Sequence, residues 1–110
     1  MVRQSKKVIT SKRYEGHLIE ILKYGIATFG SFQARRYFNT VSKFVEELTN
    51  DYFCYPECRH LTTKSRMYRN IILDAHLIIY RITGEHIEVL DIVHSASSIR
   101  KIKESRKIRL

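Results

Sequence analysis

The stretch from residue 68 to residue 94, YRNIILDAHLIIYRITGEHIEVLDIVH, constrains the fold more than the rest of the chain does. It is dominated by Ile, Leu, Val and Tyr, which favour a pleated, half-buried surface. Polar or small residues interrupt it only at Asp74–Ala75 and at Thr83–Gly84–Glu85. The stretch therefore predicts three antiparallel strands joined by two short turns.

The second turn gives an expected register for the last two strands. A two-residue turn at Gly84–Glu85, or a four-residue turn around it, places Arg81 opposite Glu88. One face then carries mainly apolar residues, namely Ile78, Tyr80, Ile82, Ile87, Val89 and Val93. The other face carries Arg81, Glu88 and His94 with Leu77, Ile79, Leu90 and Ile92. A three-residue loop would exchange the two sets, because side chains alternate between the faces of a strand.

Two helices are predicted upstream of this sheet. Apolar residues recur in both at spacings of three and four, at Tyr14, Leu18, Ile21, Leu22, Gly25 and Phe29, and then at Ala34, Tyr37, Phe38, Val41, Phe44, Val45 and Leu48. Thr10 or Ser11 provides an N-cap for the first helix, and Gly30–Ser31 makes a short connection, so the helices are antiparallel. Gly25 weakens its helix, and we expect it to admit another backbone closely.

The predicted fold is α+β. A short strand at residues 7–10 precedes the helical hairpin, which packs on one face of an antiparallel sheet of about four strands and leaves the opposite face free for a partner. Residues 50–66 form a long ordered loop between the hairpin and the sheet. After His94, either Ser95 or Ser98 begins a short, basic C-terminal helix. With 110 residues, 44% of them hydrophobic, the whole chain is expected to form one domain.

Positive charge lies mainly at the two ends of the chain. The formal net charge is +9; residues 1–13 hold five cations and no acid, and residues 95–110 hold six cations and one acid. Such ends favour a polyanion or an acidic protein partner, or form a simple solvated surface. The predicted binding residues are Arg100, Lys101, Lys103, Arg106, Lys107 and Arg109. Deleting residues 100–110 is expected to weaken binding with little change in thermal stability.

The sequence argues against several other classes of protein. It has no window of 18 apolar residues and no signal peptide, so we expect a cytoplasmic protein without a membrane partner. It has no glycine-rich phosphate loop, and no cofactor is expected. Cys54, Cys58 and His60 form a C-x3-C-x-H pattern. Because a structural zinc site needs four ligands, no metal site is predicted.

Three residues are candidates for catalysis if the chain is a nuclease, namely Arg69, Arg81 and His94. Arginine matches phosphate oxygens, and histidine titrates near neutral pH. Each has a structural alternative: Arg81 pairs with Glu88, Arg69 faces water, and His94 bonds to the following loop. The register also separates Arg81 from His94 by roughly 20 Å at ~3.3 Å per residue, too far for joint action on one phosphate.

The order of the elements, joined to particular residues, resembles the RelE/ParE superfamily of toxins from type II toxin-antitoxin systems. The matching positions are Tyr24, Phe29–Gly30, Ala34 and Tyr37 in the hairpin, and Tyr68–Arg69, His76–Arg81 and Ile87–His94 in the strands. The hairpin positions resemble the ParE branch more than the RelE branch. The chain departs from the superfamily at Ser95–Ser98, where one or two Arg often stand, and it lacks the C-terminal Tyr of some RelE-like nucleases.

This resemblance implies one of three activities. A ParE-like toxin binds and inhibits DNA gyrase without chemistry of its own, which is the expected function. A RelE-like toxin cleaves messenger RNA on the ribosome, which would make the chain an enzyme. A toxin-fold module without toxicity would only bind an antitoxin or nucleic acid. The implied partner in every case is a cognate antitoxin, a short acidic protein encoded next to the chain, which would cover apolar surface on the hairpin.

Overall fold

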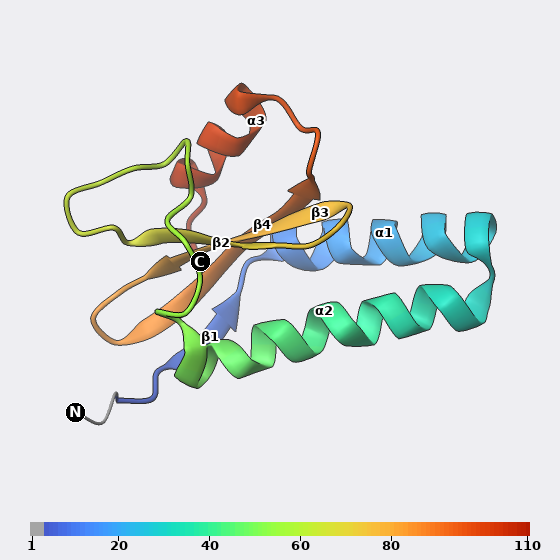
Figure 1. Ribbon diagram of the computed structural model, residues 1–110, viewed down its shortest axis with the longest axis horizontal. Coiled ribbons are helices and arrows are strands. Elements are labelled where there is room, and N and C mark those ends of the chain that lie inside the picture. Colours follow the sequence, from blue (N-terminus) through green and yellow to red (C-terminus); the bar gives the residue numbers. More distant parts are fainter. Residues whose placement is uncertain (1–3) are drawn as a thin grey trace.

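The structure, a computed structural model, describes residues 4–110 (Figure 1). In chain order the elements are β1 (Lys7–Thr10), α1 (Lys12–Phe29), α2 (Ser31–Asp51), β2 (Tyr68–Ile72), β3 (His76–Ile82), β4 (His86–His94), α3 (Ile99–Lys103) and the 3-10 helix η1 (Glu104–Lys107). This order is the one predicted from the sequence. Arg3, one of the cations expected in the basic N-terminal segment, lies outside the described residues.

The four strands form one sheet with the order β1-β4-β3-β2. β2, β3 and β4 are the predicted antiparallel meander, and Arg81 lies opposite Glu88 as expected. β1 pairs with β4 in parallel, so the sheet is mixed rather than antiparallel throughout. Parallel strands need a long crossover, and here the helical hairpin and two strands separate β1 from β4 in the chain.

An irregularity in β4 changes which of its residues share a face. The register between β3 and β4 shifts between Ile79 and Tyr80, which leaves one extra residue in β4. Such a bulge interrupts the alternation of side chains. Ile92 consequently packs in the core under the helices and Val93 packs in the core on the other face, the reverse of the assignment made from the sequence. His94 also lies on the helical side, and this corrects its expected place on the same face as Arg81.

The α1–α2 hairpin covers one face of the sheet (Figure 1). Ser11, one of the two predicted caps, begins α1 and accepts a hydrogen bond from the backbone N–H of Tyr14 at 2.9 Å. The core that joins the helices to the strands contains Tyr14, Leu18, Val41, Val45, Leu48, Tyr52, Ile71, Ile78, Tyr80, Ile87, Val89 and Ile92. A Cβ on Gly25 would lie 3.1 Å from the Cβ of Ala34, so this glycine allows the close approach of the helices that the sequence suggested.

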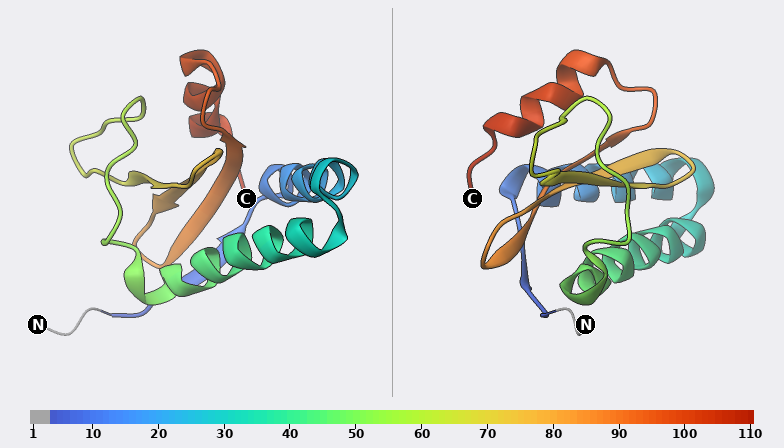
Figure 2. Two further views of the ribbon diagram at one scale, coloured as in Figure 1. Left: turned by 45° about the vertical axis from the view of Figure 1, so that its right-hand side comes forward. Right: turned by 60° about the vertical axis from the view of Figure 1, so that its left-hand side comes forward.

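The other face of the sheet is covered as well. α3, η1 and part of the loop at residues 52–67 lie across the sheet from the hairpin (Figure 2). Their side chains form a second core with the strands, made of Cys58, Leu61, Tyr68, Ile79, Leu90, Val93 and Ile102. Ile102 and Ser105 are buried, so the C-terminal segment belongs to the packing of the domain. This corrects two expectations, that the second face is free for a partner and that residues 100–110 contribute little to stability.

The distal half of the hairpin extends past the end of the sheet (Figure 1). α1 starts in the middle of β4, where the Ser11 hydroxyl donates a hydrogen bond to the Leu90 carbonyl at 2.5 Å. From there its 18 residues run about 27 Å at ~1.5 Å per residue, well beyond the end of β4 at His94. Tyr24 and Phe29 are therefore 68% and 63% exposed. Phe29, although it belongs to the apolar stripe predicted for the first helix, does not pack in the core and lines the cleft described below.

Candidate partner-binding cleft

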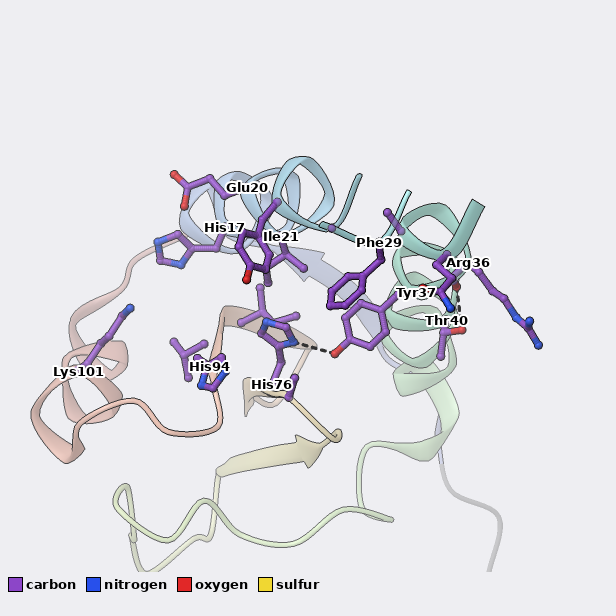
Figure 3. Close-up of a pocket in the computed structure, with 17 residues that line it drawn as sticks. His17, Glu20, Ile21, Phe29, Arg36, Tyr37, Thr40, His76, His94 and Lys101 are labelled. Atoms are coloured by element: carbon purple, nitrogen blue, oxygen red, sulfur yellow. Dashed lines mark hydrogen bonds between the residues drawn. The ribbon is translucent and has the colours of Figure 1, made fainter. Parts of the chain in front are cut away.

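A cleft of ≈ 920 Å³ lies between the distal half of the hairpin and one end of the sheet (Figure 3). Its helical walls include the apolar or aromatic side chains Ile21, Tyr24, Phe29, Ala34 and Tyr37. Its floor is formed by His76, Ile92, Val93 and His94 at the ends of β3 and β4, and Lys101 of α3 stands at one side. A mostly apolar groove of this kind suits one face of an amphipathic helix or an extended peptide.

Two histidines and a tyrosine are linked on the floor of the cleft. Tyr37 Oη lies 2.8 Å from His76 Nδ1 (Figure 3). The rings of His76 and His94 meet edge to face, with centroids 5.7 Å apart. The backbone N–H of Ala96 donates to His94 Nδ1 at 3.1 Å, so the predicted bond between His94 and the following loop is confirmed. Tyr37 also packs against the core that joins the helices to the strands.

The environment of these groups keeps two of them neutral at physiological pH. Burial lowers the pKa of His76, and the neighbouring His94 lowers it further. Burial raises the pKa of Tyr37, and the nearby Asp74 carboxylate adds to that effect. The contact between the hydroxyl and the imidazole is therefore a hydrogen bond between uncharged groups.

The carboxylate of Asp91 lies at the edge of β4 beside the cleft. Its side chain is 2% exposed, and its Oδ1 accepts a hydrogen bond from the backbone N–H of Ile92 at 2.8 Å and lies 2.6 Å from Nδ1 of His17. β1 ends at Thr10, opposite Val89, so within residues 4–110 no strand covers this edge of β4 beyond that point, while β3 pairs with the opposite edge. The carboxylate satisfies a backbone donor at this uncovered edge and holds His17 at the wall of the cleft.

Arg81 is used by the fold. Its Nε donates to Glu88 Oε1 at 2.6 Å, and its two terminal nitrogens donate to the Tyr68 hydroxyl at 3.2 Å and the Ile108 carbonyl at 3.1 Å. Burial alone would raise the pKa of Glu88, but hydrogen bonds from His86 and Arg81 outweigh it and hold that pKa below its ordinary value. The predicted cross-strand pair is confirmed, and the arginine also ties the C-terminal segment to β3.

Arg69 holds the long loop in place. It donates to the carbonyls of Tyr55 at 2.9 Å and of Phe53 and Arg66 at 3.3 Å each, and its guanidinium lies 5.2 Å from the centroid of the Phe53 ring. Several charged hydrogen bonds to loop carbonyls fix the loop against the edge of the sheet. The alternative in which Arg69 simply faces water is therefore wrong.

The structure does not bring Arg69, Arg81 and His94 together. Arg69 contacts the loop beside β2, Arg81 packs under the C-terminal segment, and His94 lies at the cleft on the other side of the sheet. Among the polar residues that line the cleft together with His94 are His17, Tyr37 and His76, and none of these three was a candidate site residue from the sequence. The pairing of His76 with His94 follows from the strand register, but the face on which they meet depends on the bulge.

The six predicted basic binding residues all lie exposed on α3, η1 or the end that follows. Lys101 reaches the side of the cleft, whereas Arg100, Lys103 and Lys107 follow a different stripe together with Glu104. Arg106 lies over the ring of Tyr68, 5.9 Å from its centroid. The cations of this segment therefore do not form one continuous surface.

Cys54 and Cys58 do not lie in a metal-binding arrangement. Cys54 is exposed, while Cys58 is buried in the second core, where burial raises the pKa of its thiol. Among residues 4–110, no group of three or more His, Cys, Asp or Glu side chains is placed to hold a metal ion. Over the same residues, none of the helices has the length and apolar character needed to span a membrane.

Comparison with known proteins identifies the family. Residues 8–99 match the family described as the ParE toxin of the type II toxin-antitoxin system parDE, and the chain belongs to this family. A solved structure titled "Chromosomal ParDE TA system from P. aeruginosa" superposes with a TM-score of 0.69 at 15% sequence identity, over 84% of this chain and 98% of that one. At that identity, the similarity shows a shared fold. Curated protein sequences give no significant match.

Proposed function

We propose that this chain arrests growth by binding and inhibiting DNA gyrase, and that a cognate antitoxin neutralises it by filling the cleft. Its membership in the ParE toxin family carries this proposal. The action is inhibition by binding, without a reaction catalysed by the toxin itself. It takes place in the cytoplasm, where gyrase and DNA are found.

The candidate nuclease residues support binding over catalysis. The guanidinium groups of Arg69 and Arg81 donate hydrogen bonds to protein carbonyls, a hydroxyl and a carboxylate. A guanidinium that stabilises a phosphoryl transition state must instead face the reacting phosphate. Phosphate bound to Arg81 would have to displace both Glu88 and the C-terminal segment, so the RelE-like alternative is disfavoured.

The proposed binding site of the antitoxin is the cleft, because the walls of the cleft are large apolar side chains that are exposed in the free chain. Tyr24 and Phe29 lie at its mouth with more than half of their surface in contact with solvent. Exposed apolar surface of this extent marks an interaction site in a protein of this size. The basic stripe of Arg100, Lys103 and Lys107 lies away from the cleft and is proposed to contact the target.

Target identity is tested by adding the purified chain to DNA gyrase in a supercoiling assay. We expect loss of supercoiling, and in cells growth arrest with a DNA-damage response. The same preparation added to translating ribosomes should leave messenger RNA intact. Message cleavage with normal supercoiling would support the nuclease instead, and the absence of any growth effect would support a module without toxicity.

The binding site of the antitoxin is tested with two variants of exposed aromatic residues. Tyr24→Arg places a charge on the wall of the cleft, whereas Phe32→Arg changes a residue that is 79% exposed and does not line the cleft. Calorimetry with the antitoxin encoded by the adjoining reading frame should show binding weakened at least tenfold by Tyr24→Arg and unchanged by Phe32→Arg. Equal effects would place the antitoxin elsewhere.

A further inference from the structure

We propose that the His76–His94 pair binds a carboxylate of the antitoxin and takes up a proton when the complex forms. This inference rests on the proposed antitoxin-binding site. The toxin would then be held more tightly as the pH falls from 8 to 6. The partner at this position is an Asp or Glu side chain on an otherwise apolar segment. The inference follows from how the two rings are held and from which of their atoms remain unused.

Both rings are fixed through the same nitrogen. His76 uses Nδ1 toward the Tyr37 hydroxyl, and His94 uses Nδ1 to accept the N–H of Ala96. Within residues 4–110, no hydrogen bond engages Nε2 of either ring. Because its Nδ1 is an acceptor, neutral His94 must carry its hydrogen on Nε2. An apolar segment covering the cleft floor would leave these polar atoms buried without partners, and a carboxylate would satisfy them.

The charges around the pair favour a negative group there. Lys101 from α3 stands at the side of the cleft (Figure 3). The Asp91 carboxylate is already paired with His17 of α1. The Glu20 carboxylate of α1 and the Arg36 guanidinium of α2 are both directed outward (Figure 3). From α2 the neutral Tyr37 faces His76, and Asp74 of the β2–β3 turn acts on that tyrosine.

Proton uptake follows from the change in surroundings. In the free chain, burial and the adjacent ring disfavour a charge on His76. A carboxylate within about 4–6 Å reverses this preference, since an opposite charge stabilises the protonated imidazole. A group whose pKa rises on binding makes affinity increase as pH falls through that pKa, by at most about tenfold per pH unit for one proton.

The test is a titration of the toxin with the antitoxin from the adjoining reading frame, by calorimetry at pH 8 and pH 6. We expect Kd to fall by about tenfold between these values for the unaltered chain. The double variant His76→Asn/His94→Asn keeps a polar atom near each Nδ1 and removes Nε2, so the pH dependence should disappear. His60→Asn, in the loop on the other side of the sheet, is the matched control and should retain it.

The outcomes distinguish a failure of the histidine proposal from a failure of the proposed antitoxin-binding site. Suppose that Tyr24→Arg weakens binding, but that the affinity is independent of pH, or depends on pH equally in the double variant. That result would overturn the proposed role of the histidines and leave the cleft as the antitoxin-binding site. Binding indifferent to Tyr24→Arg would overturn both. Ring nitrogen NMR of the unaltered complex at pH 7.5 needs no variant. We expect a protonated His76, and a neutral His76 ring would contradict the inference.

Discussion

Gly16 and Gly25 lie in the same helix but meet different surroundings. A Cβ at Gly25 would lie 3.1 Å from Ala34 Cβ, whereas one at Gly16 meets nothing within 4 Å. Gly25→Val should therefore lower the free energy of unfolding by about 1–3 kcal/mol through overpacking. Gly16→Val should leave it unchanged or raise it slightly, because valine is a better helix former than glycine. Thermal unfolding of both variants checks this, and equal effects would argue against close packing of the two helices.

Glu88 gives the stability a defined dependence on pH. Its pKa is lowered in the folded state, so its contribution is present above the pKa of the unfolded chain and is lost as pH falls through the folded value. Glu88→Gln should reduce stability at pH 7 by about 1–3 kcal/mol, since it weakens charged hydrogen bonds to a buried arginine. The difference from the unaltered chain should shrink as pH falls through the lowered pKa of folded Glu88, because the carboxylate then becomes protonated.

Urea unfolding at several pH values measures this difference. Glu85→Gln, in the exposed turn of the same strand pair, is the control and should change stability little at either pH. A Glu88→Gln deficit that stays constant from pH 7 to pH 3 would mean that the carboxylate is not the titrating group.

At single positions, the sequence predicted those contacts that depend only on neighbours or on strand register. The cap at Ser11, the glycine contact and the Arg81–Glu88 pair all follow from local spacing. The contacts of Arg69 with loop carbonyls, and of His17 with Asp91, join residues far apart in the chain. The periodicity of the sequence does not reveal such contacts, because they depend on tertiary packing.

Among the elements, α3 is where the sequence misled most. Its short length and high charge suggested a loosely attached end, yet Ile102 is 5% exposed within the second core. Ile102→Ala should lower the free energy of unfolding by about 2–4 kcal/mol. Ile99→Ala, at a position 51% exposed in the same helix, should change it by less than about 0.5 kcal/mol. Guanidinium unfolding of both variants compares them, and similar small losses would mean that α3 is not firmly packed.

β4 shows why the elements could be placed while their faces could not. Its length and its partner follow from composition and from the turn at Gly84–Glu85. The extra residue near Leu90 has no signal in the sequence, since no glycine or proline marks it. That one residue decides whether His94 shares a face with Arg81 or with His76, and so whether His94 lies at the cleft.

For the whole molecule, the decisive feature is the offset between the hairpin and the sheet. α1 begins in the middle of β4, so the helical pair runs past the strands and leaves a cleft with exposed aromatic walls. The sequence predicted the hairpin, the meander and exposed apolar surface on the helices, but the position of this surface depends on where α1 starts along the sheet. The second face, expected to be open, is closed by α3 and the loop.

Amide hydrogen exchange of the toxin, free and bound to its antitoxin, tests the proposed antitoxin-binding site most directly. If the antitoxin fills the cleft, added protection should concentrate in the distal hairpin, residues 20–40, and at the ends of β3 and β4, while α3 and residues 52–67 change little. Protection confined to α3 and the loop, with the distal hairpin exchanging as in the free chain, would contradict the account.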